Sequence, residues 1–154
     1  MRFQRLKRGG AEKVYATFKN KEARQLLPGE PVCVDFVTDK DGSTIAEPAN
    51  TSVHFPAGVI VKTIGTSGNF DDTGEILVYG YAEKIKVNAA DTINAGDPLS
   101  IVAGSSSFVD MSVTTEGEAT DAELVELANC IAIAGTTISA STENQTIRGF
   151  VRAL

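Results

Sequence analysis

Residues 75–87 read EILVYGYAEKIKV, and this stretch decides the fold class. It is the longest candidate strand in the chain and is rich in β-branched and aromatic residues. Gly80 lies in its middle, where a glycine indicates a bulge or a sharp bend, as in a sheet that curls toward a barrel. The sequence therefore predicts a curved sheet with this strand as its longest member.

Shorter strand candidates lie on both sides of this stretch, with turn residues about every 8–15 positions, a spacing typical of sandwiches and barrels. The polar segments 40–52 and 65–74 are expected to be surface loops. We therefore predict a mainly β fold, a small β-sandwich or β-barrel. The shorter strands are expected at 32–37, 59–64, 98–102, 107–113, 131–138 and 146–154.

Two segments have helical rather than strand character. Residues 20–27 place Asn20 as a possible N-cap before good helix formers, and Pro28-Gly29 stops the run, which predicts a short helix over 21–27. Residues 120–128 carry Thr120 with Glu123 at the capping-box position, which favours a second short helix. The alternative for this second segment is an acidic loop that leads into the strand at 131.

The length of 154 residues fits one domain. Hydrophobic residues make up 42% of the chain and charged residues 22%, so the chain has enough apolar side chains for a globular core. No apolar run approaches the roughly 20 residues of a membrane span, and the N-terminus lacks the apolar core of a signal peptide. Cys33 and Cys130 are too few and too far apart for a disulfide scaffold or a zinc site. We therefore expect two reduced thiols and synthesis in the cytoplasm.

Charge is distributed unevenly along the chain. Residues 1–24 hold eight basic and two acidic side chains, a net charge of +6, whereas the remaining residues carry a net charge of −12. This predicts a basic N-terminal arm (1–13) on a single acidic β domain (14–154), and the acidic domain would repel nucleic acid. The arm is a partner-binding segment, a solvated terminus or a segment that folds back onto the acidic domain. Its candidate partner-binding residues are Arg2, Phe3, Arg5, Leu6, Lys7 and Arg8.

The chain offers little material for catalysis. His54 is the only histidine, so a two-histidine metal site is excluded, and neither cysteine lies in a nucleophile motif. Asp39-Lys40-Asp41-Gly42 lacks the EF-hand spacing and is better explained as a turn. The glycines at 65 and 68 lack the Lys-Ser/Thr pair of a phosphate-binding loop. We expect no enzyme activity, no metal and no cofactor.

A specific turn pattern occurs at 85–102, IKVNAADTINAGDPLSIV. Gly96 can supply a turn angle that other residues avoid, and Pro98 can begin a strand where no ladder donor is needed. The segment resembles the hairpin of biotinyl and lipoyl carrier domains. No lysine follows Asp97, however, so the attachment chemistry is missing and only the geometry of a small β-barrel hairpin is retained.

More of the chain resembles the capsid cement, or head decoration, proteins of tailed bacteriophages. The corresponding segments are 32–37, 80–99, 104–107, 130–135 (CIAIAG) and 147–154 (IRGFVRAL). The resemblance implies a virion structural protein made in the host cytoplasm. It would sit on the capsid exterior, commonly as a homotrimer, bind the major capsid protein and stabilise the shell. The basic arm and the acidic segment 114–129 depart from the family pattern, so docking details are not carried over.

Other functions fit the same composition. A tail, baseplate or receptor-binding β module would use exposed aromatic loops rather than a basic arm. A small ligand-binding β-barrel would need a deep polar pocket, and a hydrolase would need a pocket between subunits. For a cement protein, the arm would lie across neighbouring capsid subunits. Its basic residues would pair with carboxylates, and Phe3 and Leu6 would fill apolar pockets.

Overall fold

The computed structural model describes the backbone of residues 3–6 and, in full, residues 12–49, 55–88, 90, 92–111, 130–141 and 144–153. Within these ranges the chain forms ten strands and no helix, so the predicted mainly β fold is confirmed. The strands are β1 (Phe3–Leu6), β2 (Lys13–Asn20), β3 (Pro31–Val34), β4 (Thr44–Ala46), β5 (Pro56–Ile60), β6 (Thr73–Asn88), β7 (Pro98–Ile101), β8 (Phe108–Asp110), β9 (Cys130–Ala134) and β10 (Asn144–Arg152).

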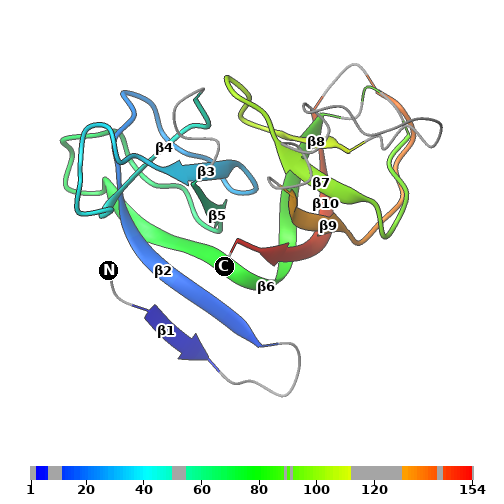
Figure 1. Ribbon diagram of the computed structural model, residues 1–154, viewed down its shortest axis with the longest axis horizontal. Helices are drawn as coiled ribbons and strands as arrows, with labels where there is room; N and C mark the ends of the chain where they lie inside the picture. Colours follow the sequence, from blue (N-terminus) through cyan, green and yellow to red (C-terminus); the bar gives the residue numbers. More distant parts are fainter. Residues whose placement is uncertain are drawn as a thin grey trace.

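The sheet closes on itself twice. Its strand order is β1-β2-β4-β3-β5-β6-β10-β9-β7-β8, and two additional pairings join β2 to β6 and β6 to β8. The first pairing closes a ring of strands β2 to β6, and the second closes a ring of strands β6 to β10. We call these rings the first and the second barrel. Figure 1 shows them side by side, with the long strand β6 passing from one to the other.

Strand β6 can belong to both barrels because it bends at Gly80. Before the bend it pairs with β2 and β5, and after it with β10 and, at its end, β8. Gly80 has a φ of +118°, and a Cβ there would lie 2.5 Å from the carbonyl oxygen of Glu12. Only glycine fits this conformation and this close approach, which confirms the bend predicted from the sequence.

Each barrel has its own apolar core. The first is filled by a cluster that includes Leu26, Ile45 and Ile76, and the second by a cluster that includes Phe108 and Ile131. Burying such side chains contributes about 1.5–3 kcal/mol each. The second cluster also contains residues of the first barrel, namely Cys33, Val59 and Leu77, so the two barrels pack against each other.

The two barrels have the same topology. In each barrel the order of strands round the ring is first, third, second, fourth, fifth, and the fifth strand pairs with the first to close it. The first and third strands are parallel to each other in both barrels. β6 is the fifth strand of the first barrel and the first strand of the second. Both barrels also share a register, since Pro31 lies opposite Val59 as Pro98 lies opposite Ile133. The second and fourth strands then shift register by one residue, between Val32 and Cys33 in the first barrel and between Leu99 and Ser100 in the second.

The connection between the first two strands is equivalent in both barrels as well. The amide of Gly29 donates to the carbonyl of Ile60, and the amide of Gly96 donates to the carbonyl of Ala134, both at 2.8 Å. Both glycines have positive φ, and each is followed by an acidic residue and a proline, Gly-Glu-Pro at 29–31 and Gly-Asp-Pro at 96–98. The fold is thus an internal repeat that shares one strand.

This repeat explains why the predicted helix over 21–27 is wrong. Asn20 does not cap a helix: its side chain donates to the carbonyls of Arg24 and Gly65, at 2.8 and 2.7 Å. Leu26 is fully buried and forms an isolated bridge with Ile64, as Ile93 does with Ile138 in the second barrel. Long-range pairing therefore replaces the local hydrogen bonds that a helix would make. The second predicted helix, 120–128, lies outside the described residues.

Several strands differ from the sequence expectation. β2 was not predicted, because its sequence KVYATFKN mixes apolar and charged residues over its length. β4 lies inside the segment 40–52 that was expected to be a loop, and it is only three residues long. β5 begins at Pro56 and ends at Ile60, earlier than the predicted strand at 59–64. The turn at Asp39–Gly42 is confirmed, with Gly42 at a φ of +70°.

Candidate functional site

Part of the predicted arm, the backbone of residues 3–6, lies along the edge of the sheet. The backbone of β1 is antiparallel to β2, with Phe3 opposite Ala16, Arg5 opposite Val14 and Leu6 opposite Lys13. Within the described residues β1 pairs with no other strand, so it is an edge strand with a free outer side. Arg2, Lys7 and Arg8 lie outside the described residues. The structure thus holds part of the basic segment in extended form against the domain.

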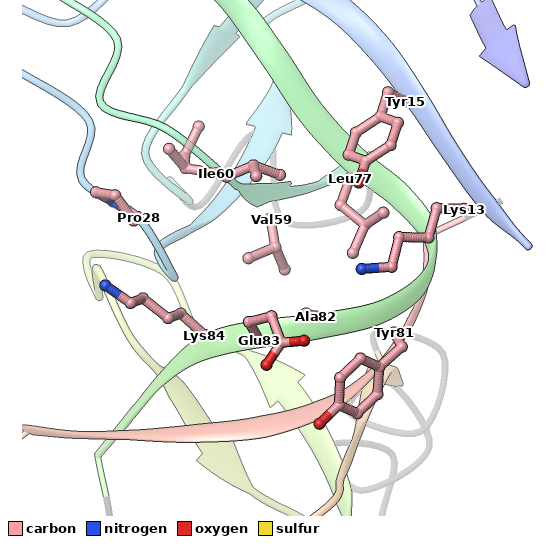
Figure 2. A pocket seen from close by; sticks show the side chains of 11 residues that line it. Lys13, Tyr15, Pro28, Val59, Ile60, Leu77, Tyr81, Ala82, Glu83 and Lys84 are labelled. Carbon is pink, nitrogen blue, oxygen red and sulfur yellow. The ribbon is translucent and has the colours of Figure 1, made fainter. Parts of the chain in front are cut away.

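A groove lies where the two barrels meet, beside the bend of β6, and we call it the junction groove. It has a volume of about 190 Å³. Its floor is apolar and consists of Val59, Leu77 and Ala82, all buried. Figure 2 shows Tyr15 and Tyr81 on its walls and Lys13, Glu83 and Lys84 around it. Pro28, Ile60 and Val61 complete the lining.

The rim of the junction groove carries positive charge. The ammonium group of Lys13 lies 5.7 Å from the centre of the Tyr81 ring, within the range of a cation–π contact. Glu83 is placed near Arg148, at 3.7 Å, and both side chains are largely exposed. Lys13 and Lys84 have no ion-pair partner within the described part of the chain. The groove therefore combines an apolar floor with two cations that are available to a ligand.

The hydroxyl of Tyr15 in the groove wall remains neutral at ordinary pH. Burial raises the pKa of Tyr15, and the nearby charge of Glu75 raises it further. A neutral phenol can donate or accept a hydrogen bond at the groove wall but cannot act as an anion there. The groove thus presents aromatic faces and ammonium groups, which suit the binding of a side chain.

A second polar cluster links the two barrels. Glu30 is only 2% exposed, and its carboxylate accepts hydrogen bonds from Arg24 (2.8 Å), Lys86 (3.1 Å) and the amide of Leu27 (3.1 Å). Lys86 also donates to the hydroxyl of Ser106, at 3.0 Å. Burial raises the pKa of Glu30, but the hydrogen bonds from Arg24, Leu27 and Lys86 outweigh it, so this pKa lies below its ordinary value. Because both of its basic partners are fixed, this cluster has a structural role.

The other residues considered for catalysis or metal binding form no cluster within the described part of the chain. Cys33 is buried and Cys130 is half-buried, and both are free thiols. His54 lies outside the described residues. Where the structure describes the chain, it holds no group of three or more His, Cys, Asp or Glu side chains that could bind a metal. It also contains no helix that is long and apolar enough to cross a membrane.

Aromatic side chains project from loops of the first barrel. Phe70 is fully exposed in the loop before β6, and Phe36 and Phe55 are about half exposed. The rings of Phe36 and Phe55 meet edge to face at 5.0 Å. These exposed rings are a second candidate contact surface.

Sequence reasoning missed the junction groove because its residues come from three strands, one of them unpredicted. A signal for it exists in the repeat. Tyr15-Ala16 and Tyr81-Ala82 are the same dipeptide at equivalent positions of the two barrels. Aligning 15–34 with 81–101 would have placed both tyrosines on corresponding strands.

Comparisons with known proteins return few matches. No family model matches the chain, and no curated protein matches it. Among solved structures, the crystal structure of head fiber gp8.5 N base in bacteriophage phi29 is 13% identical, with a TM-score of 0.49. The alignment covers 90% of this chain and 95% of that chain.

Proposed function

We propose that the chain is a virion structural protein of a tailed bacteriophage, a cement or decoration protein that binds the outside of the capsid and stabilises the shell. In this proposal it is not an enzyme and needs no cofactor. Its partners are the major capsid protein and further copies of itself, as a homotrimer, rather than nucleic acid or a membrane.

The observation that carries the proposal is the placement of the basic segment. β1 presents the backbone of Phe3–Leu6 at a free sheet edge, and the sequence around it has four basic residues and no acidic one within its first ten positions. An edge strand offers unpaired backbone groups to a neighbouring chain. The basic residues around this edge would attract an acidic surface of the shell, because opposite charges attract.

The segments that resemble the cement family also occupy defined places in the fold. Residues 32–37 overlap β3, residues 80–99 cover the second half of β6 and the turn into β7, and 130–135 and 147–154 overlap β9 and β10. The resemblance thus spans both barrels. Binding that requires an assembled shell would stabilise that shell, because a ligand stabilises the state it binds.

The proposal is tested by binding to shells. Purified protein is added to emptied capsids of the phage that encodes it, and occupancy is measured by sedimentation and by cryo-electron microscopy. We expect saturable binding in hundreds of copies per particle, as the family resemblance implies, with threefold density on the outer surface. Absence of binding, or only about 3–20 copies at a tail vertex, would overturn it.

A second candidate is a tail, baseplate or receptor-binding module, and one observation favours it. The exposed rings of Phe36, Phe55 and Phe70 fit a surface that recognises a receptor. Replacing all three rings by serine would abolish adsorption to host cells in this case. For a cement protein the same variant would keep its shell occupancy.

A further inference from the structure

The internal repeat allows the junction groove to be compared with its counterpart in the second barrel. Tyr15 lies opposite Leu77, which in turn lies opposite Val59. In the second barrel Tyr81 lies opposite Phe150, which in turn lies opposite Ile133. Leu77 and Phe150 are therefore equivalent positions, and so are Tyr15 and Tyr81.

The second barrel fills this position with its own aromatic rings. Phe150 packs edge to face against Tyr79, with ring centres 5.1 Å apart and an interplanar angle of 87°. Two residues before Tyr81 and Tyr15 along their strands lie Tyr79 and Lys13, although only the first barrel shifts register at this point, between Val14 and Tyr15. The second barrel thus has two large rings where the first barrel has Leu77 and Lys13.

The first barrel leaves the corresponding space open. The smaller Leu77 forms the floor of the junction groove, and the flexible side chain of Lys13 reaches across it toward Tyr81 (Figure 2). Val61 beside the groove is 41% exposed, so the apolar surface continues to the outside. The missing volume is that of a bulky apolar side chain.

The charges at the rim of the junction groove indicate which residues of a ligand should flank an apolar side chain that fills this volume. Lys13 and Lys84 have no ion-pair partner within the described residues, and the one acidic residue of the lining, Glu83, is close to Arg148. A ligand segment with carboxylates beside its apolar anchor would pair with the two ammonium groups. A segment with basic flanks would be repelled.

We propose that the junction groove is a docking site for a segment of the major capsid protein that inserts one aromatic or leucine side chain, flanked by carboxylates, between Tyr15 and Tyr81. The inserted side chain takes the place that Phe150 takes in the second barrel. This proposal rests on the proposed function and specifies a contact that is separate from the β1 edge.

The test uses the full chain and emptied shells. Leu77→Phe fills the groove with the residue found at the equivalent position, and it is expected to weaken shell binding at least tenfold. Equal affinity of this variant and the unchanged protein would overturn the docking site while leaving the proposed function intact. If the unchanged protein does not bind shells, the proposed function fails and the docking site fails with it.

A charge variant keeps the test independent of core packing. Lys13→Glu combined with Lys84→Glu alters only the rim and is expected to weaken shell binding at least tenfold and to reduce its salt dependence. The matched control, Lys21→Glu with Lys40→Glu, makes the same change of charge at exposed positions outside the groove. An equal loss of binding in both double variants would overturn the docking site, because net charge alone would then explain it.

A second copy of this chain is the alternative occupant. Light scattering of Leu77→Phe would show a loss of self-association in that case, with shell affinity per subunit unchanged. That result would overturn the capsid segment as the occupant. Unchanged oligomeric state with weakened shell binding supports it.

Discussion

The two barrels follow the same path yet present different outer faces. In the second barrel Phe150 and Tyr79 cover the face that β10 and β6 share, whereas in the first barrel Leu77 and Lys13 leave a groove at the equivalent place. The strand order, the register of the second and fourth strands and the Gly-acid-Pro turns are the same in both. The pairing of backbones therefore sets the barrel, and two side chains on its outside decide whether a face is closed or open.

The barrels also differ in how their first turn is anchored. In the second barrel Asp97 accepts a hydrogen bond from the amide of Asn94, and in the first barrel Glu30 accepts one from the amide of Leu27. The longer side chain of Glu30 additionally reaches Arg24 and Lys86. The side chain of Glu30, which is one methylene longer than that of Asp97, therefore connects the two barrels, whereas the side chain of Asp97 makes the contact within its own turn.

The largest expected effect comes from removing residues 150–154. Val151 is fully buried and pairs with both β6 and β9, so the truncation opens the second barrel and exposes its core. We expect insoluble or unfolded protein, because the exposed strand edges and core favour aggregation. Expression and circular dichroism check this. A soluble, folded monomer would show that the second barrel does not depend on its last strand.

Gly80→Ala tests the strand that the barrels share. A Cβ at this position meets the backbone of Glu12 and Lys13 at 2.5 and 3.0 Å, and the φ of +118° strains any other residue. We expect a loss of about 3 kcal/mol in the free energy of unfolding, measured by urea denaturation. Gly96→Ala is the matched control, since its φ is +100° but nothing lies within 4 Å. It should cost about 1 kcal/mol, and an equal cost for both would mean that the close approach is unimportant.

Glu30→Gln tests the connection between the barrels. At pH 7 we expect a loss of about 2 kcal/mol in the free energy of unfolding, because hydrogen bonds from two cations to a buried carboxylate are weakened. The control Asp97→Asn should cost less, since the carboxylate of Asp97 makes a local turn contact.

The same variant predicts a pH dependence. The folded-state pKa of Glu30 lies below its unfolded value, near 4.5. Its contribution to stability is therefore complete above pH 4.5 and is lost as the pH falls through the folded-state pKa. The stability difference between Glu30→Gln and the unchanged protein should shrink in urea titrations as the pH falls below 4.5. A constant difference across this range would contradict an ionised Glu30.

The smallest effect on stability is expected from removing residues 1–10. β1 pairs only with β2 within the described residues, so we expect the melting temperature to be nearly unchanged. Shell binding should weaken and become less sensitive to salt, because exposed charges are screened. Occupancy across a salt series, for the full and the truncated chain, measures this. Equal binding with equal salt sensitivity would exclude the basic segment as a contact.

Patterns of neighbouring residues were enough to find most strands. The runs that contain β6, β7, β9 and β10 are rich in apolar and β-branched residues, and Gly80 marked the bend before any pairing was known. The Gly-Asp-Pro turn at 96–98 was also recognised from its residues. The same turn at 29–31 was overlooked, because the helix formers that precede it predict a helix when only local preferences are considered.

Local preference failed where pairing over long distances decided the structure. The bridge between Leu26 and Ile64 and the burial of Asn20 against Gly65 are contacts between distant residues, and they outweigh a helix of two turns. β4 is too short to show a period, and it exists because β2 and β3 offer it partners.

The sequence by itself determined that the chain is mainly β, that it bends at Gly80 and that positive charge gathers at its start. These features depend on backbone angles, side-chain preferences and charge, which each residue carries with it. Only the tertiary structure decided that the sheet closes twice around β6 and that Leu77, Tyr15 and Tyr81 border one groove. The reason is physical: Leu77 and Tyr81 lie on β6 on either side of its bend, so they meet Tyr15 only after β2 has paired with β6, and a shift of that pairing by one residue would turn Tyr15 to the opposite face.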